Sequence, residues 1–182
     1  MGEILYSIVG FKRFLKQFIT LLQEDIIPMF QITANTEIAA ITLNQVPDRP
    51  GIGAQVFGSL WTRGINVFLV SSTPLTGGKS NITLSVSKKD LEPAIVTLKK
   101  VQHDIGAYSL STDFDVALIC LESPDLAFTS GIGKRLFEVL SANKINVHAI
   151  SSSGTSLTCM IAEADASKVL EALNKEFKVG KK

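Results

Sequence analysis

Residues 51–72 read GIGAQVFGSLWTRGINVFLVSS, and residues 131–152 read GIGKRLFEVLSANKINVHAISS. The second stretch repeats the first at an offset of 80 residues and without a gap. Internal similarity at a fixed offset indicates two copies of one structural unit, so it constrains the architecture before any single residue is interpreted. The residues that recur are Gly51, Ile52, Gly53, Phe57, Leu60, Ile65, Asn66, Val67, Ser71 and Ser72.

Both copies predict the same order of elements. Apolar residues spaced three and four apart predict a first helix of about three turns. Alternating apolar residues beginning at Ile65 and Ile145 predict a strand directly after each helix. A glycine-containing turn, another alternating strand and a second amphipathic helix follow. The expected ranges are 52–60, 65–70, 81–87 and 91–101 in the first copy, and 132–140, 145–150, 156–162 and 166–177 in the second.

Further strands complete the pattern. Strands are expected before each first helix, at 38–44 and 115–122, and residues 107–112 are expected to close the first copy. The second copy shows no closing strand of its own, and an unpaired sheet edge promotes aggregation. We therefore expect the β-prone segment 29–34 to cross over and fill that edge. The sequence predicts an α+β fold of two tandem ferredoxin-like βαββαβ modules with antiparallel sheets.

The first residues form a separate segment. Ile4, Ile8, Phe11, Leu15 and further apolar residues make one stripe of a predicted amphipathic helix. Basic residues interrupt it, which argues against a span across a bilayer. The alternatives are a helix that packs or oligomerises, a membrane-surface helix, a poorly ordered segment and a remnant of a longer parent chain.

Composition excludes several classes of function. The 182 residues carry a net charge of +1, with 46% hydrophobic and 19% charged residues, as in a packed globular protein without a field that attracts nucleic acid. Cys120 and Cys159 are too few for a disulfide scaffold, which favours a reducing, cytoplasmic setting. We expect small molecules or proteins as partners.

Catalytic, metal and cofactor sites find little support. His103 and His148 lie on different predicted elements, and neither has an evident nucleophile and acid to complete a triad. The run Gly77-Gly78-Lys79-Ser80 lacks the leading glycine of a phosphate-binding loop and connects two strands. We expect no catalytic residue, no metal and no cofactor.

The run Val46-Pro47-Asp48-Arg49-Pro50-Gly51, the predicted helix after it and Gly64-Ile65-Asn66-Val67 together resemble the paired ACT domains at the regulatory end of aspartate kinase. The resemblance covers residues 30–177 and implies a regulatory subunit without the kinase domain. It implies a first ACT module at 29–113, with 29–34 as a strand for the second module. It also implies a second module at 114–178, an amino-terminal extension at 1–28 and a tail at 179–182.

The sequence departs from the family pattern at a few places. Ser72 and Thr73 stand where the family usually has Gln-Asn, and Ser130 replaces the loop proline in the second copy. Residues 153–156 read Ser-Gly-Thr-Ser where the family usually has Ser-Glu-Ile-Arg. These changes leave the identity of the ligand open.

A free amino acid needs partners for a carboxylate and an ammonium. The amides and the positive dipole at the start of the first helix favour a carboxylate, its glycines allow close approach, and Asp48 can pair with the ammonium. Asn66 and Val67, or Asn146 and Val147 of the other copy, can close the pocket across a seam between sheets. The expected ligand-binding residues are Asp48, Arg49, Pro50, Gly51, Ile52, Gly53, Ala54, Gln55, Asn66, Val67, Ser72, Asn146, Val147 and Ile150. The alternative is that Asp48 caps the helix and the asparagines are structural.

The resemblance implies an allosteric sensor for lysine, threonine or a related amino acid in aspartate-family biosynthesis. Such a sensor would act as a homodimer, or as a hetero-oligomer with a kinase-type catalytic chain. An assembly module whose ligand sites have decayed is the alternative, and a sensor held at a membrane surface by residues 1–28 is a third.

Overall fold

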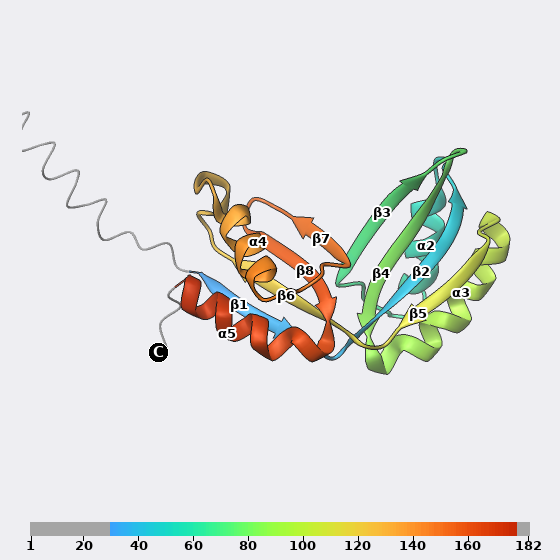
Figure 1. The fold of residues 1–182 in the computed structure, drawn as a ribbon. Helices are drawn as coiled ribbons and strands as arrows, with labels where there is room; N and C mark the ends of the chain where they lie inside the picture. The colour runs from blue at the N-terminus through green and yellow to red at the C-terminus, as the bar shows by residue number, and fades with distance from the viewer. Residues whose placement is uncertain (1–29, 178–182) are drawn as a thin grey trace, which may run out of the picture.

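The computed structural model describes residues 30–177. Two four-stranded antiparallel sheets, each covered on one face by two helices, form two modules side by side (Figure 1). The predicted α+β class with two ferredoxin-like modules is therefore confirmed. The amphipathic helix expected at residues 1–28 and the tail at 179–182 lie outside the described residues.

The first module is contiguous in sequence. Its strand order is β3-β4-β2-β5, all antiparallel. Residues of β4 that face the helices alternate with polar residues on the uncovered face, as a half-covered sheet requires. On the uncovered face of β2, Thr42 and Asn44 are polar, whereas Ile38 and Ala40 are apolar and buried. Its elements are β2 (Ile38–Pro47), α2 (Ile52–Trp61), β3 (Leu69–Leu75), β4 (Lys79–Ser87), the 3-10 helix η1 (Lys88–Asp90), α3 (Leu91–Ile105) and β5 (Ser109–Asp113).

The fourth strand of the second module comes from residues that precede the first module in the sequence. Strand β1 (Gln31–Asn35) pairs antiparallel with β6, with Ile32 opposite Leu121, in a sheet of order β1-β6-β8-β7. The ring of Phe30 packs on that of Phe177, with centroids 4.9 Å apart. The remaining elements are β6 (Val116–Glu122), the 3-10 helix η2 (Leu126–Phe128), α4 (Ile132–Ala142), β7 (Ala149–Ser152), β8 (Ser156–Ala162), the 3-10 helix η3 (Glu163–Asp165) and α5 (Ala166–Glu176).

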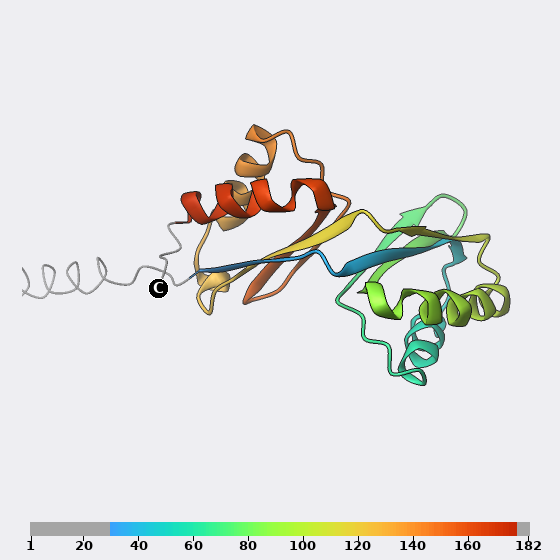
Figure 2. The same cartoon turned by 90° about the horizontal axis from the view of Figure 1, so that it is seen from below.

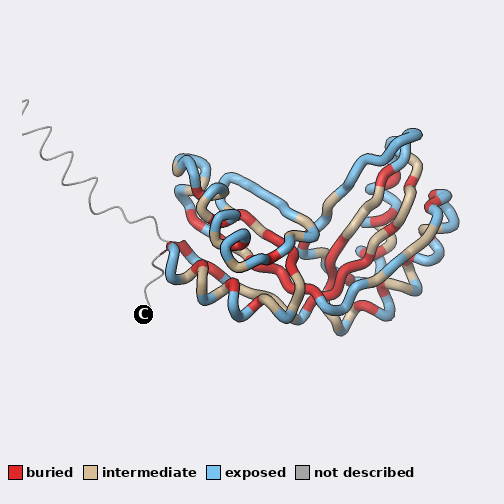
Figure 3. The backbone as a smooth tube through the Cα atoms, viewed as in Figure 1, coloured by how far each residue is buried: buried red, intermediate tan, exposed pale blue. Residues whose placement is uncertain are grey.

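Each module has its own hydrophobic core between its sheet and its helices. In the first, Ile41, Leu43 and Leu84 of the sheet meet Leu60 and Leu98 of the helices, and all five are almost fully buried. Figure 3 shows these buried stretches along the central strands and the inner helix faces. Each core is therefore complete within one module.

The strand expected directly after each first helix begins later than predicted. Strand β3 starts at Leu69 and β7 at Ala149, so the strand assignment from Ile65 and Ile145 was wrong for four residues in each copy. The reason is the helix end. The Ile65 amide donates to the Leu60 carbonyl at 3.1 Å and the Ile145 amide to the Leu140 carbonyl at 2.9 Å. These bonds continue the helix terminus, although the alternation in burial already resembles a strand.

The modules meet at a junction formed by the uncovered faces of the two sheets. Its apolar residues form a cluster separate from both module cores. From this junction the two sheets diverge in Figure 1, and in Figure 2 the helices of the two modules lie on opposite sides of the chain. The buried residues of this cluster are Ile38, Ala40, Leu69, Val116, Leu118 and Met160.

Candidate functional site

The loop between β2 and α2 is anchored on the β3–β4 hairpin. The Asp48 amide donates to the Gly78 carbonyl at 2.9 Å, and the Gln45 amide donates to Asn81 Oδ1 at 2.9 Å. Arg49 Nη2 lies 3.5 Å from the Ile105 carbonyl, at the carboxyl end of α3. These bonds hold the loop backbone in place and leave the Asp48 side chain exposed. Within residues 30–177 its carboxylate makes no hydrogen bond or ion pair.

The start of α2 is an open anion site in its geometry. Gly51 has φ +93°, a left-handed conformation that other residues adopt at a cost, and its carbonyl accepts the first helical bond from Gln55. No side chain caps this end of α2. The amides of Ile52, Gly53 and Ala54 therefore remain available, and the helix dipole favours a negative group beside them.

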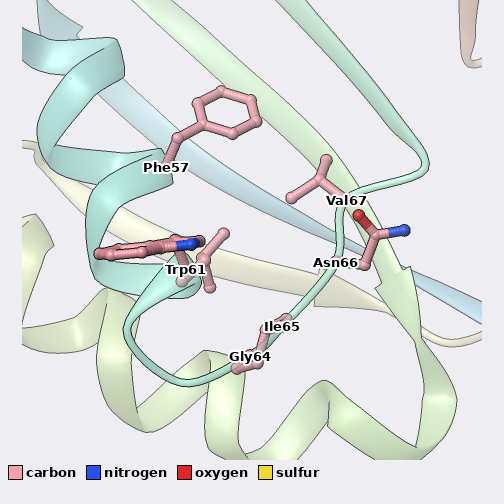
Figure 4. A pocket seen from close by; sticks show the side chains of 7 residues that line it. Phe57, Trp61, Gly64, Ile65, Asn66 and Val67 are labelled. Atoms are coloured by element: carbon pink, nitrogen blue, oxygen red, sulfur yellow. The ribbon is translucent and has the colours of Figure 1, made fainter.

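Asn66 and Val67 lie at the other end of α2. They line a cavity of about 400 Å³ together with the side chains of Phe57 and Trp61 (Figure 4). A helix of ten residues is about 15 Å long at 1.5 Å per residue. Within one chain, the structure thus places the Asp48 loop and the Asn66–Val67 pair at opposite ends of the helix.

The predicted residues of the second copy are no closer to the Asp48 loop. Val147 packs against the second core, Asn146 precedes β7, and Ile150 lies within β7 beside Ala149, which packs on the junction. The Asp48 loop follows the far end of β2, whose ten residues span about 30 Å from the junction at roughly 3.3 Å each. Ser72 is exposed on β3. One chain alone does not bring the expected set together.

A second cavity, which the residue pattern did not predict, lies at the start of α4. It has a volume of about 290 Å³. One wall is η2, which is held by a bond from the Ala127 amide to the Gly154 carbonyl at 2.9 Å. Its lining residues are Leu126, Ala127, Thr129, Gly131, Ile132, Gly133, Ser152, Ser153 and Leu157.

The sequence contains a signal for η2, one wall of this second cavity. Pro124-Asp125 repeats Pro47-Asp48, but Asp125 precedes Gly131 by six residues, whereas Asp48 precedes Gly51 by three. The three additional residues correspond in number to the 3-10 helix η2. The two copies therefore present different surroundings at equivalent helix starts.

The two cysteines and His103 lie in different surroundings. Burial raises the pKa of the Cys159 thiol to about 11, and burial also raises the pKa of the Cys120 thiol, so both stay protonated at neutral pH. His103 is almost fully exposed, and its Nδ1 lies 3.6 Å from Asp104 Oδ1. No group of three metal-binding side chains occurs among residues 30–177. No helix in this part of the chain is long and apolar enough to cross a membrane.

Comparison with known proteins shows similarity to one family model and to several enzymes. Residues 119–177 match the ACT domain model. The chain is 25% identical over 148 residues to the aspartokinase of Pseudomonas aeruginosa, covering 81% of this chain and 36% of that enzyme. It is 28% identical over 144 residues to the aspartokinase of Corynebacterium efficiens, covering 78% and 34%. The chain thus spans about a third of the length of these curated relatives.

Two solved structures match over nearly the whole length of the aligned chain. The ligand-free regulatory subunit of aspartate kinase from Thermus thermophilus superposes with a TM-score of 0.75 at 25% identity, covering 80% of this chain and 96% of that one. A structure of aspartokinase alpha and beta subunits gives 0.74 at 24% identity, covering 81% and 97%. The described residues therefore correspond to the regulatory region and not to the kinase domain.

Proposed function

We propose that this chain, whose described residues correspond to the regulatory region of aspartate kinase, binds a small amino acid and transmits that binding to a kinase-type catalytic chain. The observation that carries the proposal is the match to a complete regulatory subunit, at 96% coverage of that chain. Lysine, threonine or a related amino acid of the aspartate family is the effector class that we propose.

The start of α2 supports amino-acid binding in the first module. Free amides and the helix dipole favour the ligand carboxylate, and the unpaired Asp48 carboxylate is positioned on the adjoining loop to accept the ammonium. Gly51 and Gly53 lie beside open space, since a Cβ added at either would meet no atom within 4 Å. The ligand side chain would then extend away from α2.

A second copy of the chain supplies the residues that one chain leaves apart. Asn66 and Val67 lie at the opposite end of α2, so an antiparallel pairing of α2 and β3 with the same elements of another chain would bring them beside the Asp48 loop of that chain. The exposed apolar residues of α2 and β3, among them Phe57, Trp61 and Val70, support such a pairing. We propose Arg49, Pro50, Ile52, Ala54, Gln55 and Ser72 as neighbours of this shared site, with Asn146, Val147 and Ile150 in the equivalent place of the second module.

A ligand controls a partner only if it binds one arrangement of the protein better than another. A site shared between two chains meets this condition, because ligand binding and chain pairing then favour each other. The sensor would shift the packing of the regulatory modules on the catalytic chain.

A thermal-shift screen against the twenty amino acids tests the proposal. A ligand that binds only the folded state at a hundred times its Kd adds about 2.7 kcal/mol of stability, which raises the Tm by roughly 5–10 °C for a chain of this size. Asp48→Asn removes the charge that pairs with the ammonium and should abolish the shift while keeping the Tm of the free protein.

Asp125→Asn is the matched control, because Asp125 follows Pro124 as Asp48 follows Pro47 and lies in the other module. We expect it to keep the shift. A shift lost equally in both variants would place the effector elsewhere, and the absence of any shift at millimolar concentrations would contradict the sensor.

An assembly module without a ligand is the second candidate. One observation favours it: apolar residues stay exposed at matching positions of both copies, with Phe57 and Phe137 at 41% and 43% and Val70 and Ile150 at 44% and 42% exposure. Repetition of exposed apolar residues favours a contact surface used by both modules. Oligomers that form in the absence of any thermal shift would support this candidate.

A further inference from the structure

The junction between the modules joins equivalent positions of the repeat. Ile38 and Val116 begin equivalent strands, β2 and β6, and Ala40 and Leu118 follow two residues later on the same face. Leu69 and Ala149 begin the equivalent strands β3 and β7, and these strands contact each other. The modules therefore meet through an approximate two-fold rotation, which agrees with the opposite placement of their helices in Figure 2.

Equivalent positions of the two modules meet at the junction, but their side chains differ in size. Ala40 corresponds to the larger Leu118, and Leu69 corresponds to the smaller Ala149. Ser85 pairs with Ala40 and Leu69 in its sheet, as Met160 pairs with Leu118 and Ala149 in the other. In a symmetric contact between identical chains, only residues close to the two-fold axis face their own copy. Duplication within one chain allows the side chains at equivalent positions of the two modules to differ in size.

Two charged residues at equivalent positions also differ between the modules, and they attract each other. Lys88 and Glu163 are the first residues of η1 and η3, and Lys88 Nζ lies 2.7 Å from Glu163 Oε2 across the junction. Their amides are held in equivalent ways, with Lys88 donating to the Glu37 carbonyl at 3.0 Å and Glu163 to the Asp115 carbonyl at 2.8 Å. The hydrogen bond to Glu163 raises the pKa of the Lys88 ammonium. This pair is an attraction that a symmetric contact of identical residues would turn into repulsion.

Two short connections cross the junction. Residues 36–37 lead from β1 to β2, and residues 114–115 lead from β5 to β6. Each begins with a side-chain turn, in which the Glu37 amide donates to Asn35 Oδ1 and the Asp115 amide to Asp113 Oδ1, both at 3.0 Å. Two neighbouring connections restrict relative motion of the modules to a rotation about the line that joins them.

One group at the junction opposes closure. Ser85 is fully buried, and its Oγ is the buried side-chain oxygen or nitrogen without a hydrogen-bond partner among the described residues. It lies on the sheet face that carries Ala40 and Leu69, so the second module contributes to its burial. Rotation of the modules apart would return this hydroxyl to water.

We propose that the junction is a one-axis hinge with two positions, in which the Lys88–Glu163 ion pair is the latch of the closed position. The apolar cluster favours closure and the Ser85 hydroxyl opposes it. Both members of the latch remain about one-third exposed, at 32% and 36%, so water and salt can reach the pair when it opens. This proposal does not depend on the proposed ligand site.

Distances between spin labels on the two modules test the hinge in the full chain. Lys99→Cys on α3 and Glu171→Cys on α5 provide exposed label sites, in a background carrying Cys120→Ser and Cys159→Ala. We expect one narrow distance distribution for this parent. Lys88→Met and Glu163→Gln should each add a second distance population, and the exchange Lys88→Glu with Glu163→Lys should restore the single one. High salt should add the second population in the parent.

The ion pair Lys134–Glu138, 3.0 Å apart within α4, supplies the control. Lys134→Met removes an ion pair without touching the junction and should leave the distribution narrow. Circular dichroism and the Tm report whether each variant is folded. A distribution that stays narrow in both single variants, or that the charge exchange does not restore, overturns the latch.

Discussion

Gly64 and Lys144 show how the repeat constrains a single residue. They occupy the same position after the first helix of each copy, and both have left-handed backbones, with φ of +66° and +59°. In each copy the next amide bonds back to the helix, which makes this conformation part of the helix end. Glycine adopts it freely, whereas lysine carries a Cβ that clashes with its own backbone.

Lys144→Gly should therefore stabilise the protein by about 1 kcal/mol, since the strain removed exceeds the entropy that glycine adds to the unfolded chain. Urea unfolding monitored by circular dichroism measures the change. Gly64→Ala is the reciprocal variant and should destabilise by about the same amount. If both substitutions shift stability in the same direction, the strain at Lys144 is not the cause.

The candidate site could be predicted from the sequence one residue at a time, but not as an arrangement. Asp48, Gly51 and Gly53 do lie together on an open helix start, because a loop and the helix after it are neighbours in any fold. Asn66 and Val67 lie a helix length away. In the proposed pairing of two chains, their relation to Asp48 depends on how the chains meet, and no pattern within one chain encodes that geometry.

Strand β1 completes the sheet of the second module. It covers the edge of β6 with a full register of paired residues, and Phe30, just before it, packs edge-to-face on Phe177. The guanidinium of Arg135 lies 4.4 Å from the centroid of the same Phe177 ring and pairs with Glu176 at 2.8 Å. The end of α5 is thus fixed by a residue distant in sequence.

Phe30→Ala should lower the free energy of unfolding by about 3–4 kcal/mol, because it removes a buried aromatic ring and leaves a cavity beside Phe177. Equilibrium denaturation measures this loss. Phe128→Ala is the control, since that ring is 90% exposed on η2 and its removal should change stability by less than about 0.5 kcal/mol. Equal effects of the two variants would show that Phe30 contributes no packing.

The spacing of apolar residues predicted which segments are helices and which are strands. It did not predict the residue at which each strand begins. The two helices and the strand order within each copy agree with the alternation and the three-to-four spacing of apolar residues. Residues 65–68 and 145–148 alternate in burial as a strand would, yet they lie outside β3 and β7. Alternation records which side chains face the core, and an extended connection over the core satisfies it equally well.

At the scale of the whole molecule, the exposed apolar residues predict self-association. Phe57 and Phe137 are equivalent residues of α2 and α4 and neither belongs to a core. Phe57→Glu should weaken dimerisation roughly 30-fold or more, the effect of losing a central apolar contact. Sedimentation equilibrium measures the dissociation constant. Tyr108→Glu removes another exposed aromatic, away from α2 and β3, and should leave it unchanged.

The placement of the two modules could not be predicted from the repeat. Residues 38–44 and 115–122 were predicted as strands, and Ile38, Ala40 and Leu118 are buried on the face away from the helices, in the junction. A strand that is apolar on both faces is buried on both sides, and the sequence does not say by what. The complementary pairs at the junction become visible only when the modules are placed together.

The insertion of the first module between β1 and β6 also sets an order of assembly. Ile32 cannot pair with Leu121 until the residues of the first module have been synthesised. That module is contiguous, so it can fold alone and bring the two flanking connections to one place. Its folding shortens the loop that β1 would otherwise have to close at random, which reduces the entropy cost of completing the second sheet. Until then the edge of β6 has no partner, and the newly made chain is most exposed to aggregation in the interval between the two folding events.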